Sequence, residues 1–210
     1  QYEFIAGVVG WVDMEDLLVL NRLKALSTNP YFKGIRPMLQ DIGDVDWILN
    51  EDFSPLLQLM ADKNLSFDAL VKDIHLANIL ILARRHPSLK IVIDHCGKPD
   101  LANSPSALWQ NGLRELAACN NVFIKLSGLL TQAPAGKVLL ADIQPIFNLL
   151  INEFGVERVM WGSDWPVINL NGDYAAWLEL TTALLSELSI ADQTKIWSSN
   201  AQNFYTLSHI

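Results

Sequence analysis

Short apolar runs alternate with longer segments of helical periodicity along the whole chain. An apolar run of about four to eight residues bounded by turn residues is typical of a strand in a parallel sheet. The run Ile91-Val92-Ile93 indicates a strand that is buried on both faces. The predicted strands are 4–12, 33–39, 65–71, 90–94, 121–128 and 158–161.

The segments between these runs predict helices. The first helix is expected to follow Asp13 as its N-cap and to carry one apolar stripe, formed by Leu17, Leu20, Leu23 and Leu26. Pro145 indicates either the true start of the helix predicted over 137–154 or a kink in it. The other predicted helices are 53–62, 74–85, 104–118, 174–188 and 191–207.

The spacing of the strand ends favours a parallel sheet with helices outside it. The intervals Arg36 to Asp68, His95 to Ser127 and Ser127 to Asp164 are each roughly the 30 or more residues of one βαβ unit. Six such strands make either an open doubly wound sheet or an incomplete barrel, and an open remnant of a barrel exposes two edges that proteins normally avoid. A missing pair of N-terminal strands resolves this conflict.

The start of the chain points the same way, because Gln1 is not a methionine and already lies beside a predicted strand. We therefore predict a single domain over 1–210 of the α/β class. It is expected to be a TIM-type (β/α)8 barrel that is N-terminally truncated and retains about six βα units.

Composition restricts the class of function. Half of the 210 residues are hydrophobic and 18% are charged, which excludes a disordered chain. The net charge of -8 opposes binding to nucleic acid, and no apolar run is long enough to span a membrane. Two cysteines, Cys96 and Cys119, form no disulfide framework, so a reducing cytoplasm is expected. A homo-oligomer is permitted, but no surface patch predicts one.

Two strand ends carry candidate chemistry. The run Val159-Met160-Trp161 stops abruptly and is followed by Asp164, and the strand 90–94 leads directly into His95 and Cys96. The carboxyl ends of parallel strands face the ligand crevice, so an acid or imidazole at such an end is a functional candidate. The alternative for Asp164 is a turn residue or helix N-cap.

Six motifs, in order along the chain, resemble those of the sugar-lactonase group of the amidohydrolase-related family. They are GVVGWVDM at 7–14, KGIRP at 33–37, DHCGKP at 94–99, KLSG at 125–128, GSDWP at 162–166 and NAQNFYTL at 200–207. The group includes L-fuconolactonase, L-rhamnonolactonase and pyrone-dicarboxylate lactonase types. Each motif is weak alone, but the resemblance covers nearly the whole chain.

The resemblance implies a role for each residue that matches a motif. Asp164 would be the general base on water, His95 would polarise the carbonyl or hold a metal, and Arg36 would anchor a substrate carboxylate or hydroxyl. The His-x-His pair that the superfamily carries on its first strand has no counterpart after Gln1. One divalent, zinc-like metal is therefore an open expectation that the residues present do not require, and no residue is assigned as a metal ligand.

Lactone hydrolysis needs a base for water and donors for the negative charge that develops on the carbonyl oxygen. Asp164, His95 and Arg36 supply both, so we predict a hydrolase that opens a sugar-acid lactone or related cyclic ester and takes a small-molecule substrate. One alternative is a metal-dependent decarboxylase or amide hydrolase on the same fold. Another is an inactive fragment or binding scaffold.

Several residues keep a structural alternative. His95 could be a satisfied core histidine, and Arg36 could form a bridge with Asp13 or Asp68. Lys125 is a substrate-binding candidate that could equally be structural. Trp11 and Trp165 could wall a sugar pocket or belong to the core.

The remaining cysteines and histidines are not expected to act. Cys96 follows His95 directly, and neighbours on a strand point to opposite faces, so a nucleophilic pair is not expected. Cys119 is expected to lie on a helix in the core. His75, His86 and His209 show no partner spacing and are expected at the surface or at helix ends.

Overall fold

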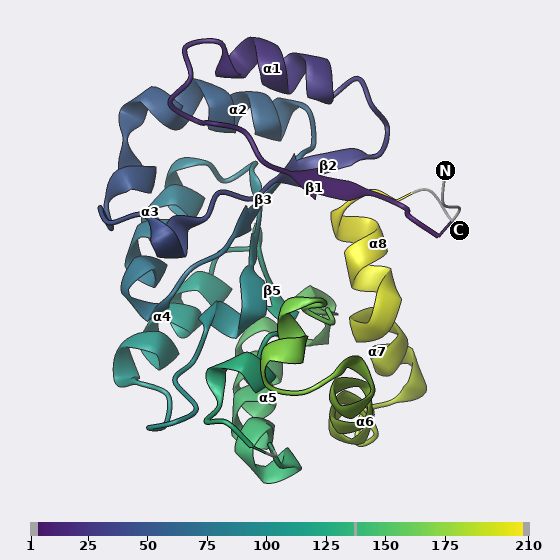
Figure 1. Ribbon diagram of the computed structural model, residues 1–210. Helices are drawn as coiled ribbons and strands as arrows, with labels where there is room; N and C mark the ends of the chain where they lie inside the picture. Colours follow the sequence, from purple (N-terminus) through teal and green to yellow (C-terminus); the bar gives the residue numbers. More distant parts are fainter. Residues whose placement is uncertain (1–3, 137, 208–210) are drawn as a thin grey trace.

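A computed structural model describes residues 4–136 and 138–207, and it contains one parallel sheet with helices wrapped around its outer face (Figure 1). The strands follow each other in chain order across the sheet, from β1 to β6. They are β1 (Val8–Gly10), β2 (Phe32–Ile35), β3 (Ser66–Ala69), β4 (Lys90–Ile93), β5 (Val122–Leu126) and β6 (Val159–Trp161). Each predicted strand is confirmed, although most are shorter at their ends than expected.

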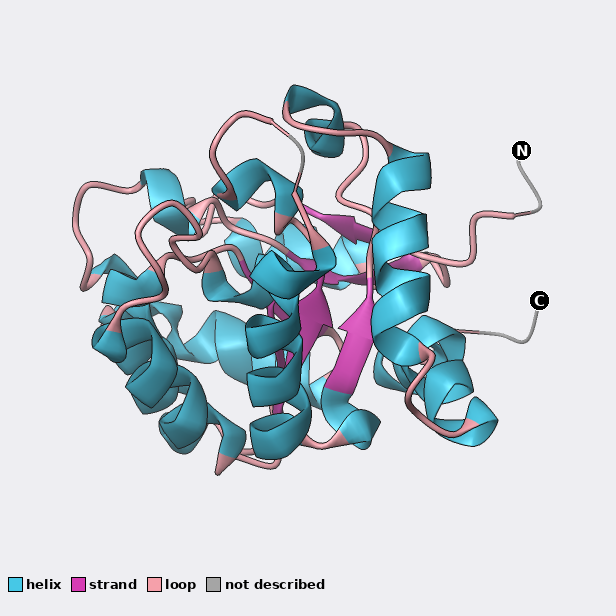
Figure 2. Cartoon of the chain, turned by 90° about the horizontal axis from the view of Figure 1, so that it is seen from below, coloured by secondary structure: helices cyan, strands magenta, loops and turns pink. Residues whose placement is uncertain are grey.

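The sheet is an incomplete barrel. Every neighbouring pair is parallel, and in the described part of the chain β1 pairs only with β2 and β6 only with β5. Two edges therefore remain, as predicted for a barrel that lacks a pair of strands. Figure 2 shows the strands enclosed by helices on one side and the β1 edge turned toward the described start of the chain.

The helices match the predicted βα alternation. They are α1 (Val19–Leu26), α2 (Ser54–Asp62), α3 (Leu76–Arg85), α4 (Ala107–Ala117), α5 (Leu140–Phe154), α6 (Tyr174–Leu185), α7 (Ile190–Thr194) and α8 (Asn200–Phe204). A π-helical turn, Lys195–Ser199, joins α7 to α8, so the closing helix is one continuous helical run. Among the described residues no helix is both long and apolar enough to cross a bilayer.

Details of the first helix were predicted wrongly. Asp13 does not cap α1, because its carboxylate accepts from the backbone N–H of Glu15 and Leu18 is the N-cap. Leu17 lies before the helix and is 99% exposed, whereas Leu23 is fully buried. Leucines spaced by three drift around a helix of 3.6 residues per turn, so they do not form one stripe. In α5, Pro145 lies inside the helix, which begins at Leu140.

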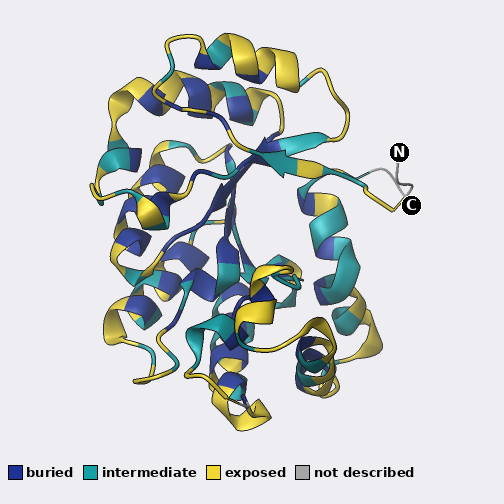
Figure 3. Cartoon of the chain, in the orientation of Figure 1, coloured by how far each residue is buried: buried dark blue, intermediate teal, exposed yellow. Residues whose placement is uncertain are grey.

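The core lies between the sheet and the outer helices. Strands β3 and β4 are almost wholly buried, and one contiguous apolar cluster runs from Val12 to Ile196 (Figure 3). Such a core fixes the strand ends in space, and those ends carry the candidate residues.

Candidate active site

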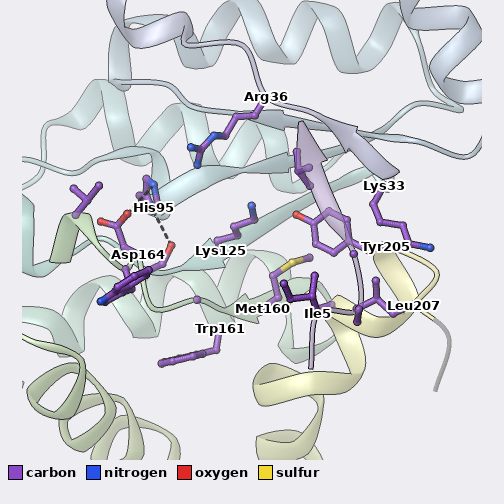
Figure 4. A pocket seen from close by; sticks show the side chains of 18 of the residues that line it. Ile5, Lys33, Arg36, His95, Lys125, Met160, Trp161, Asp164, Tyr205 and Leu207 are labelled. Carbon is purple, nitrogen blue, oxygen red and sulfur yellow. Dashed lines mark hydrogen bonds and ion pairs between the residues drawn. The ribbon is translucent and has the colours of Figure 1, made fainter. Parts of the chain in front are cut away.

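A cavity of about 620 Å³ opens at the carboxyl ends of the strands and extends along the inner face of the sheet. Arg36, His95, Lys125, Asp164 and Trp165 all line it. Figure 4 shows His95 and Asp164 at one end, Lys125 toward the middle and Tyr205 at the other end. The structure thus brings together five of the predicted site residues from four strands, since Asp164 and Trp165 both follow β6.

Asp164 lies just beyond β6 in a strained backbone conformation. Its φ is 59°, in the left-handed region that non-glycine residues rarely adopt. Its backbone carbonyl accepts from Ile168 N–H at 2.9 Å, and its Oδ1 lies 3.4 Å from His95 Nε2. The cap interpretation is not supported, because the 3-10 turn that follows has Pro166 as its N-cap and no side-chain cap bond.

His95 lies in the turn after β4, where its φ of 52° is also left-handed. Its Nδ1 is 2.9 Å from Ser127 Oγ, and its side chain is 12% exposed at the cavity wall. Gly128 makes room for the ring: its φ is +69°, and a Cβ there would lie 2.6 Å from His95 Cβ. His95 is therefore part of the cavity wall rather than a histidine of the apolar core.

Burial favours the neutral forms of both groups. It raises the pKa of the Asp164 carboxyl, and His95 and Lys98 oppose that shift only in part. It lowers the pKa of the His95 imidazole against the attraction of Asp94 and Asp164. Shifts in these directions, in a carboxyl and an imidazole that share a cavity, are typical of groups that transfer protons at functional sites.

Arg36 follows β2 and is held by a partner other than those expected. Its Nη1 lies 3.5 Å from Asp94 Oδ2, and Asp94 is fully buried. The expected bridge to Asp13 or Asp68 is wrong, because Asp68 is paired with Lys125 instead. The Arg36 side chain remains 38% exposed, so its guanidinium stays accessible from the cavity.

Lys125 projects inward from β5 between two buried carboxylates. Its Nζ lies 2.6 Å from Asp68 Oδ2 and 2.7 Å from Asp94 Oδ1. Burial disfavours the ammonium, but Asp68 and Asp94 outweigh it and hold the pKa of Lys125 well above its ordinary value. The contact with Asp94 has no hydrogen-bond geometry, so it acts as an ion pair.

The two tryptophans occupy different hollows. Trp165 is 68% exposed and lines the cavity beside Asp164. Trp11 is 61% exposed and lines a neighbouring apolar hollow with Pro37, Met38 and Trp47. Neither belongs to the core, and only Trp165 reaches the cavity that contains His95.

Of the remaining cysteines and histidines, those that the structure describes contribute no reactive group to the cavity. Burial raises the pKa of the Cys96 thiol to about 12, which suits an unreactive thiol. Cys119 is half-buried in the turn after α4 rather than on a helix, although it packs against the core. His75 precedes α3 but is buried rather than at the surface, and His86 is the C-cap of α3. His209 lies outside the described residues.

Sequence reasoning gave no role to Asp68, Asp94, Ser127 or Tyr205. Asp94 and Ser127 lie at the ends of predicted strands and Asp68 lies within one, and their signal was a polar residue in or beside an apolar run. Tyr205 gave no such signal, because it lies in the closing helical segment and reaches Asp68 only through the fold.

A catalytic zinc ion is normally held by three protein side chains. Within residues 4–136 and 138–207, no group of three or more His, Cys, Asp or Glu side chains could hold one ion. The described residues therefore do not by themselves fit the divalent metal that the resemblance implies. The chemistry they do support is that of an acid, an imidazole and a guanidinium.

Known proteins resemble this chain over nearly all of its length. The sequence model of the amidohydrolase family matches residues 1–207. An L-fucono-1,5-lactonase of Burkholderia ambifaria is 42% identical over 97% of this chain and 71% of its own length. An L-fucono-1,5-lactonase of Burkholderia multivorans is 34% identical over 97% of this chain and 72% of its own.

A solved structure agrees with these relatives. The crystal structure of a Burkholderia multivorans amidohydrolase with bound zinc superposes with a TM-score of 0.90 at 33% identity, and the match covers 97% of this chain and 74% of that one. Fold and similarity together define a hydrolase built on an incomplete TIM-type barrel. The chain belongs to the amidohydrolase family.

Proposed function

We propose that this protein hydrolyses a sugar-acid lactone, with Asp164 as the general base. The observation that carries the proposal is the position of Asp164 in the cavity. Its Oδ1 lies 3.4 Å from His95 Nε2, and Arg36 lines the same cavity. A base and cationic or neutral donors that converge on one cavity are what acyl transfer to water requires.

The hydrogen-bond partners favour one tautomer of His95. An ionised Asp164 carboxylate only accepts, so the Nε2 that faces it carries the proton in this proposal, and Nδ1 then accepts from the Ser127 hydroxyl at 2.9 Å. An Nε2–H donor stabilises the Asp164 carboxylate as an anion and leaves its other oxygen for water. His95 thereby orients the base, and its N–H is also available to a carbonyl oxygen in the cavity.

The proposed reaction balances without a further reactant. Asp164 takes one proton from water as the water oxygen bonds to the lactone carbonyl carbon, and negative charge moves onto the carbonyl oxygen near the donors. The carbonyl re-forms as the ring C–O bond breaks, and Asp164 returns the proton to the leaving ring oxygen. The product is the open hydroxy acid.

Arg36 supplies the anchoring charge in this proposal. Its guanidinium suits a hydroxyl pair or a carboxylate, because it presents several N–H donors in one plane. Trp165 offers an exposed ring beside Asp164, and apolar faces of sugars stack on such rings. Trp11 would contact only a substrate that extends past Pro37 into the neighbouring hollow.

The similarity to L-fucono-1,5-lactonases narrows the proposed substrate. At 42% identity over most of the chain, a 1,5-lactone of an L-fuconic type of acid is the substrate class that we propose. The solved relative with bound zinc supports an assay with and without that metal. Metal use by this chain stays a proposal.

Replacement of Asp164 tests the proposal. Asp164→Asn should lower kcat for L-fucono-1,5-lactone by about 100- to 10,000-fold, the range of a lost general base. Asp52→Asn, which changes an exposed carboxylate, serves as the control and should leave kcat unchanged. A panel of lactones, amides and carboxylated aromatic rings is assayed with both variants, with and without added zinc. Unchanged lactone hydrolysis in Asp164→Asn, or turnover of only amides or carboxylated rings, contradicts the proposal.

A further inference from the structure

A line of charged and polar groups runs beneath the cavity, from the end of the chain to Arg36. Tyr205 donates its hydroxyl to Asp68 Oδ2 at 2.6 Å, and Ser66 donates to Asp68 Oδ1 at 2.8 Å. Lys125 then joins Asp68 to Asp94. Asp94 presents its other oxygen to Arg36 at 3.5 Å.

The carboxylates of Asp68 and Asp94 are not accessible to solvent. Asp68 and Asp94 are both fully buried, so protein groups must neutralise and satisfy them. Within residues 4–136 and 138–207, Lys125 is the one ammonium paired with both carboxylates, and each carboxylate therefore competes with the other for it. Tyr205 and Ser66 each donate a hydrogen bond to Asp68, so Lys125, which also donates to Asp68 Oδ2, shares the neutralisation of Asp68 with them and still lies 2.7 Å from Asp94 Oδ1, where its charge stabilises the Asp94 carboxylate.

The segment that carries Tyr205 is fixed against the same sheet. Lys33, in β2, donates to the carbonyl of Thr206 at 2.9 Å, and Asn64 donates to the Thr206 hydroxyl at 3.0 Å. Lys90, at the start of β4, donates to the carbonyl of Phe204. Tyr205 is thereby held with its hydroxyl on Asp68, and Figure 4 shows it pointing into the cavity from the side of α8.

We propose that Tyr205, Asp68 and Lys125 are positioning residues that keep the Asp94 carboxylate available to Arg36, and so orient the guanidinium that anchors the substrate. This deepens the role of Arg36 in the proposed lactonase function and rests on it. It also gives Lys125 a role that differs from direct substrate binding. The segment after α8 that carries Tyr205 becomes a structural part of the site.

A double-mutant cycle between Tyr205 and Arg36 tests the coupling, because Asp68, Lys125 and Asp94 connect these two residues in the network. Tyr205→Phe removes only the hydroxyl. It should raise KM for L-fucono-1,5-lactone by about 2- to 30-fold, the range of coupling through a network, with a smaller change in kcat. In an Arg36→Met background the same change should have no further effect on KM. Tyr31→Phe, at an exposed tyrosine, is the matched control and should change neither constant.

A second variant reports the direction of the effect. Adding Asp68→Asn to Tyr205→Phe should restore KM toward that of the parent protein, because a neutral amide no longer competes with Asp94 for Lys125. A merely structural role for Tyr205 predicts the opposite, since a second change in the buried network would add to the damage. Equal effects of Tyr205→Phe in both Arg36 backgrounds, or no rescue by Asp68→Asn, would overturn the proposal.

A measurement without substrate separates this proposal from the lactonase proposal. The side-chain ¹H–¹⁵N NMR signals of Arg36, assigned through Arg36→Met, report whether its guanidinium rotates freely. Restricted rotation of the guanidinium is expected in the parent protein and in the variant that combines Tyr205→Phe with Asp68→Asn. Faster rotation is expected in Tyr205→Phe alone. If the parent protein fails to hydrolyse the lactone but these signals behave as expected, only the function is wrong. Unchanged Arg36 signals in Tyr205→Phe would refute the positioning role whatever the activity.

Discussion

Asp164 is an acid whose charged form the folded protein disfavours. Burial raises its pKa, and its left-handed backbone adds strain that the surrounding turn must hold. The burial of the carboxylate and the strained backbone both reduce stability. Together they accompany a position in which Asp164 lies beside His95 in the cavity. Strained and destabilised groups of this kind concentrate at functional sites, which supports a role for Asp164 in the reaction.

The raised pKa predicts how stability depends on pH. The folded protein binds a proton at Asp164 more readily than the unfolded chain, so the stabilisation from that proton is complete below the unfolded pKa of about 4 and is lost as pH rises through the folded pKa. Asp164→Asn resembles the neutral acid, and it should therefore unfold at higher urea concentration than the parent protein at pH 7.

The comparison at lower pH serves as the control for this prediction. The advantage of Asp164→Asn should shrink as the pH falls toward about 4, where the parent protein also carries the proton. Urea unfolding of both proteins at a series of pH values measures this difference in stability. A variant that is less stable at pH 7, or an advantage that does not vary with pH, would contradict the raised pKa of Asp164.

At the scale of elements, side-chain amides fasten helices to the amino ends of the strands. Asn200, the first residue of α8, donates to the carbonyls of Val156 and Val159 at 2.7 Å each. Asn121, directly before β5, performs the same function for the end of α3, where it donates to the carbonyls of Ala83, His86 and Leu89. The two bonds of Asn200 fix α8, and with it the segment that carries Tyr205, relative to β6.

Loss of the Asn200 amide should weaken this attachment. Asn200→Ala leaves buried carbonyls without a donor and should lower the free energy of unfolding by about 1–3 kcal/mol. Asn203→Ala changes an exposed position on the same helix and should have little effect. Urea unfolding of both variants gives the comparison, and equal stability of Asn200→Ala and Asn203→Ala would show that the amide contributes nothing.

At the scale of the whole molecule, an open sheet is stabilised by a continuous core. The main apolar cluster includes residues from every βα unit, and a further cluster, formed by Val92, Met160 and Phe204, is small beside it. Helices cover the outer face of the sheet, while the inner face carries the cavity and the buried charges of Asp68, Asp94 and Lys125. The stability of the charged layer therefore depends on the apolar layer behind it.

A single core predicts a single unfolding transition. Tryptophan fluorescence and far-UV circular dichroism should give coincident midpoints in urea, as expected for a two-state domain. Trp47 and Trp177 pack in different parts of the chain, so fluorescence samples both halves. Two separate transitions would show that the β1 side and the β6 side unfold independently.

The sequence by itself determined the parallel sheet, the order of its elements and the strand ends that carry Arg36, His95 and Asp164. Local reasons suffice for these features, because apolar runs define strands, and polar residues that end such runs are readable without a partner. The family also follows from short motifs, each of which lies within one strand end.

Only the tertiary structure decided which groups meet. Arg36 pairs with Asp94 rather than with Asp13 or Asp68, Lys125 divides its charge between two carboxylates, and Tyr205 crosses from the end of the chain to β3. Ion pairs and hydrogen bonds depend on distances of a few ångströms between segments far apart in sequence, and no local pattern encodes those distances. The parallel packing of neighbouring strands and the position of α8 set these distances.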